Sequence, residues 1–140
     1  MRHAPIALAL LALLAGCGHK KTTECNALAA VINDSVIALE KAPRSADDPS
    51  GITDLKAMAD SMDKVAVSVA SVQLTVPELK RVRDDYEKMA RGIARAEREL
   101  AAAAAERNAP KQKAADAALE AAVKQEDPLV DQLNKICQAP

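Results

Sequence analysis

The residues with the most chemistry to offer are the three cysteines, Cys17, Cys25 and Cys137. A thiolate acts as a nucleophile or a metal ligand, and both roles need further groups such as histidine close by. Beyond residue 16 the chain has one histidine, His19, and it lacks the Glu-x-x-His pairs that hold metals in helical bundles. The sequence therefore predicts no catalytic residue, no metal site and no cofactor.

The other polar residues do not change this interpretation. Asp47–Asp48 and Asp84–Asp85 are pairs of acids, which we interpret as solvated side chains, with weak contact to Ca²⁺ as the alternative. The chain carries 19 Lys and Arg against 20 Asp and Glu, so it has no basic excess with which to bind nucleic acid. Tyr86 is the single aromatic residue, and we expect it in the core with its hydroxyl reaching the surface. We predict that the protein is not an enzyme.

The first sixteen residues have the order of a signal peptide. A basic start, Met1-Arg2-His3, precedes the apolar residues 4–15, which are followed by small residues. The apolar stretch is shorter than the about 20 residues that a membrane-spanning helix needs. We therefore expect residues 1–16 to be a cleaved signal peptide and leave them out of the fold.

The end of this segment, Leu14-Ala15-Gly16-Cys17, resembles the lipobox of bacterial lipoproteins. The resemblance covers only about the first 20 residues. It implies cleavage before Cys17, a diacylglyceryl thioether on the Cys17 sulfur and usually a third acyl chain on the new amino group. Stable anchoring takes at least two acyl chains. Gly18, where an aspartate would favour the inner membrane, favours the outer membrane.

Lipidation of Cys17 leaves two cysteines, Cys25 and Cys137. An exported protein enters a compartment in which disulfides form, and an even pair is what one disulfide requires. The alternative is two free, buried thiols.

The composition of the chain after residue 16 predicts an all-α fold. Alanine is abundant, glycine is rare and Ala, Val, Leu and Met must form a thin core. Apolar residues recur at helical spacing, and Pro- or Gly-containing stretches separate the periodic segments. We expect helices over residues 24–41, 52–74, 76–107 and 110–137, with a kink or short break near 126–128.

The two middle helices have spacings of three and four residues typical of coiled-coil seams. We place the following in these seams: Leu55, Met58, Met62, Val65, Val69 and Val72, then Leu79, Val82, Tyr86, Met89, Ile93, Ala96, Leu100 and Ala103. Thr75 and Glu78 form a candidate capping box at the start of the third helix.

The positions of the cysteines agree with an even number of helices. In an up-down bundle the first turn of helix one and the last turn of helix four lie at the same end. Three antiparallel helices would separate Cys25 from Cys137 by more than the about 7 Å between Cα atoms that a disulfide allows. We therefore predict an antiparallel up-down four-helix bundle over residues 23–138, with residues 17–22 as a polar tether and a Cys25–Cys137 disulfide.

These features lead to a function class. We expect a lipid-anchored bacterial lipoprotein facing the periplasm, whose bundle is a structural or interaction module of the cell envelope. Its partners would be the bilayer, through acylated Cys17, and an envelope protein or cell-wall component. The alternative is a periplasmic carrier of a small ligand or metal with a site between helices.

Overall fold

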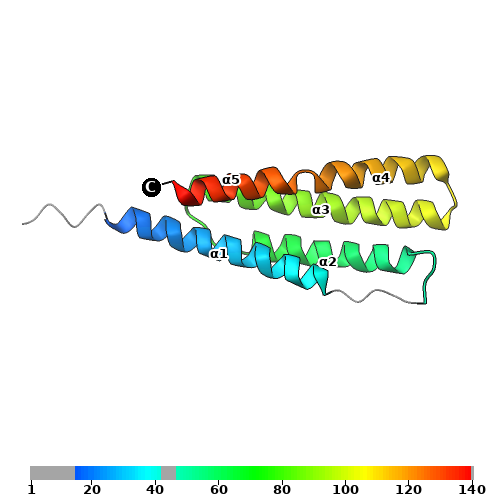
Figure 1. Ribbon diagram of the computed structural model, residues 1–140, viewed down its shortest axis with the longest axis horizontal. Coiled ribbons are helices and arrows are strands. Elements are labelled where there is room, and N and C mark those ends of the chain that lie inside the picture. Colours follow the sequence, from blue (N-terminus) through cyan, green and yellow to red (C-terminus); the bar gives the residue numbers. More distant parts are fainter. Residues whose placement is uncertain (1–14, 42–46, 140) are drawn as a thin grey trace, which may run out of the picture.

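The computed structural model describes residues 15–41 and 47–139, and within them it contains helices and no strand. The five helices are α1 (Ala15–Glu40), α2 (Ile52–Ala70), α3 (Pro77–Ala105), α4 (Ala109–Val123) and α5 (Glu126–Gln138). In Figure 1, α4 and α5 follow one another in the same direction as a single interrupted rod. The helices α1, α2 and α3 and this rod run in alternating directions. The predicted four-helix bundle is confirmed, with α4 and α5 together forming its fourth helix.

The bundle has two ends, to which we give fixed names. The base is the end that holds Cys25, Thr75 and Cys137, and the tip is the end that holds residues 47–51 and 106–108. The helix α1 stops short of the tip, whereas α2, α3 and α4 reach it (Figure 1). The helix α3 is central, since it packs against each of the other four.

The predicted seams of α2 and α3 form the core. From Met62 to Val72 on α2 and its following turn, and from Leu79 to Ala96 on α3, every predicted seam residue is buried. The alanines Ala59, Ala66, Ala90 and Ala94 are fully buried as well, so these two helices approach closely. A core of small side chains is held together by close helix contact, as the composition predicts.

The fourth helix differs from the prediction. The break lies at Lys124–Gln125, two residues before the predicted interval, and Pro128 explains the shift. Proline lacks the N–H that would bond to the carbonyl four residues earlier, which here belongs to Lys124. The break also changes the buried face. Val123 lies four residues after the apolar Leu119, a helical spacing that predicts burial, but it is 47% exposed, and Ala122 packs near Gly92 instead.

The first helix begins earlier than predicted. It starts at Ala15, so residues 18–22 are helical and do not form an extended tether. Thr23, which directly precedes the predicted helix start at residue 24 and would be its N-cap there, instead lies inside the helix, where its hydroxyl donates to the His19 carbonyl at 2.9 Å. No proline interrupts residues 15–40, so nothing local stops the helix from extending backward.

Candidate functional site

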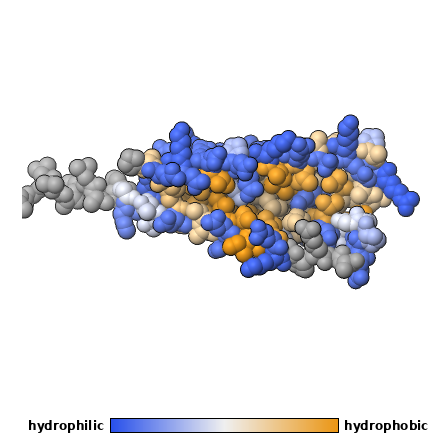
Figure 2. Space-filling model, viewed as in Figure 1, coloured by the Kyte–Doolittle hydropathy of each residue, from blue (hydrophilic) through white to orange (hydrophobic). Residues whose placement is uncertain are grey.

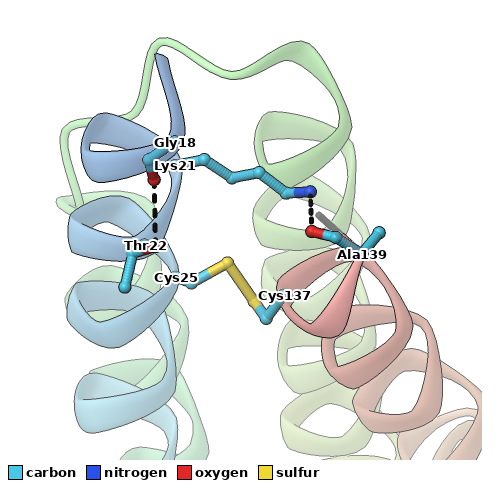
Figure 3. Close-up of a disulfide and its surroundings, with 6 residues drawn as sticks. All are labelled: Gly18, Lys21, Thr22, Cys25, Cys137 and Ala139. Carbon is cyan, nitrogen blue, oxygen red and sulfur yellow. Dashed lines mark hydrogen bonds between the residues drawn. A yellow bond between two sulfur atoms is a disulfide. The ribbon is translucent and has the colours of Figure 1, made fainter. Parts of the chain in front are cut away.

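The base of the bundle brings the predicted disulfide together. Cys25 on α1 and Cys137 on α5 are bonded, with their Cα atoms 5.8 Å apart, although they are 112 positions apart in sequence (Figure 3). Cys25 is 4% exposed and belongs to the core, whereas Cys137 is half-buried. The structure therefore confirms the pairing, which ties the start of the chain's first helix to the end of its last.

A carboxylate on α1 holds the connection between α2 and α3. Glu24 accepts hydrogen bonds from the Thr75 backbone N–H at 2.8 Å, the Thr75 hydroxyl at 2.5 Å and the Val76 N–H at 2.9 Å. These bonds, the Thr75 hydroxyl first and then the Val76 N–H, lower the pKa of Glu24 to about 2. Glu24 thus remains ionised, and it binds the two backbone amides that immediately precede α3, where its negative charge also faces the N-terminus of the helix.

This contact replaces the predicted capping box. The N-cap of α3 is Val76, which makes no side-chain capping bond, and the Thr75 hydroxyl points to Glu24. The prediction of Thr75 as N-cap was wrong because a carboxylate 51 residues away in sequence offers a stronger acceptor than the local arrangement.

A third contact closes the base. The Lys21 ammonium donates to the Ala139 carbonyl at 2.8 Å, beside the disulfide and along the same side of α1 (Figure 3). Cys17 lies one turn earlier, in the first turn of α1. Its side chain lies outside the described part of the structure, so lipidation of Cys17 stays a prediction.

Two polar contacts away from the base position the central helices. The Tyr86 hydroxyl does not reach the surface as predicted; it donates to Glu126 at 3.0 Å, and Tyr86 is only 2% exposed. Burial first, and the Glu126 carboxylate second, raise the pKa of the Tyr86 hydroxyl. On the other side of α3, Arg98 donates to both Asp60 and Asp63 of α2, each at 2.7 Å.

The predicted acid pairs have structural roles. Asp48 accepts hydrogen bonds from the Ser50 hydroxyl and from the Thr53 N–H, which together lower its pKa and cap the start of α2. Asp84 pairs with Arg83 at 2.7 Å. Within residues 15–41 and 47–139 no cluster of three or more His, Cys, Asp or Glu residues is placed to hold a metal ion.

In the part of the chain that the structure describes, one buried charged side chain has an oxygen atom without a hydrogen-bond partner. Glu97 on α3 is 6% exposed, and its Oε2 atom makes no hydrogen bond. Burial raises the pKa of Glu97 to about 7, against the opposing effect of the Arg98 charge. Its carboxyl group therefore changes charge near neutral pH, which no feature of the sequence analysis anticipated.

Grooves lie between the helices, and two of them are large. One, of about 670 Å³, runs between α3 and α4 over Gly92, Ala96 and Ala122, with Arg91 and Arg95 on its rim. The other, of about 550 Å³, separates the second half of α1 from α2. Figure 2 shows apolar residues along the middle of the visible face of the bundle, with hydrophilic residues along its edges.

Comparisons of the chain with protein-family models, with curated proteins and with solved structures each found no match. In the described residues no helix combines the length and the apolar character needed to span a bilayer. The function proposed for this protein therefore rests on its own residues and contacts.

Proposed function

We propose that this protein is a lipid-anchored lipoprotein of the bacterial envelope whose helical bundle serves as a non-enzymatic structural or interaction module. The observation that carries the proposal is the sequence Leu14-Ala15-Gly16-Cys17 behind a basic and apolar leader. Gly18 after the cysteine favours attachment to the outer membrane, with the bundle facing the periplasm.

The geometry of the base supports this arrangement. Cys25 follows Cys17 by eight positions, and in the helix α1 this interval rises only about 12 Å. An extended tether of the same length would reach roughly 29 Å. An acylated Cys17 would hold the disulfide, Glu24 and the chain end close to the lipid surface, with the tip directed away from it.

The partner in this proposal is an envelope protein or cell-wall component that meets the tip first. The tip presents the turn 106–108, where Arg107 is exposed, and the loop that precedes α2. A photo-crosslinking residue at Arg107 in intact envelopes should capture the partner, whereas the same residue at exposed Thr22, near the base, should not.

The anchor is tested by the substitution Cys17→Ser in cells that express the tagged protein. We expect the variant to lose the mass of the acyl chains and to move from the membrane to the soluble fraction. Cys25→Ser is the matched control, since it removes a thiol from the same helix and should leave acylation intact. A Cys17→Ser protein that is processed and stays in membranes with unchanged mass contradicts the proposal.

A second candidate function is supported by the groove between α1 and α2. Its volume of about 550 Å³ lies within the roughly 300–1,000 Å³ typical of small-molecule sites. Val31, Leu39 and Val65 contribute apolar surface, and the two positive charges of Lys41 and Lys64 outnumber the one negative charge of Asp34. This is the arrangement of a carrier for a small amphiphile with an anionic group.

Native mass spectrometry of protein purified from its own envelope distinguishes the two functions. A carrier should retain a bound molecule, and Ala38→Trp, which fills the groove, should release it. Ala30→Trp on the exposed side of α1 is the control and should leave the bound mass unchanged. Detection of the bare chain alone in every preparation contradicts the carrier function.

A further inference from the structure

For its length, the helix α1 makes the fewest contacts with the other helices of the bundle. Its buried apolar side chains are Cys25, Leu28 and Ile32, and none lies beyond residue 32. By comparison, α3 buries eleven residues over its length. Most helix stability in proteins comes from packing of a buried face. The helix α1 therefore gains less stability from packing, and adds less to the bundle, than its 26 residues suggest.

The second half of α1 is attached weakly. Ile37 is 45% exposed, and Val36 and Leu39 are only partly buried. The groove of about 550 Å³ lies between this half and α2, and α1 ends before the tip (Figure 1). The attachment of α1 is therefore concentrated at the base.

At the base three contacts hold α1, and only one is covalent. The Glu24 carboxylate binds the α2–α3 connection, the Lys21 ammonium binds the Ala139 carbonyl, and the disulfide joins Cys25 to Cys137. The Lys21 contact is exposed to solvent, where such bonds contribute little.

Most of the core lies outside α1, although Cys25, Leu28 and Ile32 belong to the same cluster. Val69, Leu79 and Val82 are fully buried on α2 and α3. Two contacts that do not involve α1, Arg98 with Asp60 and Asp63, and Tyr86 with Glu126, connect α3 to α2 and to α5. These contacts between α2, α3 and α5 do not depend on α1.

We propose that the Cys25–Cys137 disulfide is a redox switch that controls whether α1 stays docked on the bundle formed by α2–α5. A dithiol reductant attacks the sulfur of half-buried Cys137, Cys25 leaves as a thiolate, and the reductant then closes its own disulfide. Two electrons and two protons pass to the protein, which gains two thiols. The helix α1 then separates and uncovers the apolar surface that Leu28 and Ile32 occupied.

The release of α1 does not depend on acylation of Cys17. Its consequence does rest on the proposed function: a bundle held at the lipid surface by a docked helix would, after reduction, reach farther from that surface at the end of a free arm. The experiment below uses purified protein, so it can fail or succeed independently of the anchor.

Hydrogen exchange followed by mass spectrometry tests the switch on the whole chain, oxidised and after treatment with a dithiol. We expect amides of residues 18–40 to exchange at least about tenfold faster after reduction, and to be accelerated clearly more than those of α2–α5. The double variant Cys25→Ser/Cys137→Ser should reproduce the reduced pattern and should not respond to the dithiol.

Two outcomes overturn the inference. Unchanged exchange in α1 after reduction means that the noncovalent contacts of Glu24, Leu28 and Ile32 suffice to dock it. Equal acceleration in every helix, including a double variant that does not fold, means that α1 is integral to the bundle and that the disulfide supports the whole fold.

Discussion

The substitution Glu97→Gln tests whether burial of the Glu97 carboxylate, whose Oε2 atom makes no hydrogen bond, makes the stability of the protein depend on pH. A Gln side chain has the same shape and cannot ionise. Moving the pKa of Glu97 from 4.5 to about 7 means that folding favours the protonated carboxyl group. The stability gained from that preference is complete below the unfolded pKa of 4.5 and is lost as the pH rises through 7.

The magnitude follows from the two pKa values. Between pH 5.5 and 8.5 the unfolded chain releases the Glu97 proton more readily than the folded chain, which lowers the free energy of unfolding by about 2 kcal/mol. Glu24 and Asp48 have lowered pKa values, so the stability that they contribute is lost below this range and does not interfere. The wild-type protein should therefore lose about 2 kcal/mol over this interval through Glu97 alone.

Urea unfolding of the oxidised protein, followed by circular dichroism at pH 5.5 and 8.5, measures the effect. The free energy of unfolding of Glu97→Gln should depend less on pH than that of the wild type, by about 2 kcal/mol over the interval. Glu99→Gln, two residues away on the exposed face, should keep the wild-type dependence. Parallel pH profiles for the wild type and Glu97→Gln would refute the assignment of a raised pKa to this carboxyl group.

Three further predictions concern the fold and its base. Val65→Asp should destabilise the bundle by several kcal/mol, since it buries an unpaired charge, and an unchanged thermal midpoint would show that Val65 faces water. Removing the disulfide by Cys25→Ser/Cys137→Ser should lower the free energy of unfolding by up to about 4.7 kcal/mol in the chain-entropy model. Equal urea midpoints for the variant and the wild type would mean that closing a loop over 112 positions adds nothing to stability. Glu24→Gln should lose less stability on acidification than the wild type. The stability that comes from the lowered Glu24 pKa is present above pH 4.5 and is lost as the pH falls towards 2. An acid titration identical to that of the wild type would count against the Glu24 contacts.

The helices and their buried faces could be predicted from the sequence because the signals are local. Apolar residues at spacings of three and four place Met62, Val65 and Val69 on one side of a helix whatever packs against it. The Cys25–Cys137 disulfide could be predicted as well, since an even number of antiparallel helices puts the first and last turns at the same end.

The polar contacts of the base could not be predicted in the same way. Glu24 reads in the sequence as one more solvated acid, and its bond to Thr75 joins residues 51 apart. Thr75 followed by Glu78 matched a local capping pattern, but the Thr75 hydroxyl donates instead to the Glu24 carboxylate on another helix. Val123 matched the helical period too, and only the break before Pro128 moved it to the surface.

The sequence by itself determined that the chain is helical, where its turns fall, that Cys25 and Cys137 can meet and that Cys17 stands in a lipobox-like motif. The tertiary structure decided which polar groups lose water and which find partners. Glu97 lies four residues from both Ile93 and Ala101, so its position next to the seam was visible, but its lack of a partner was not. Hydrogen bonding and burial depend on groups that the fold brings from distant parts of the chain, whereas helical periodicity depends only on neighbours.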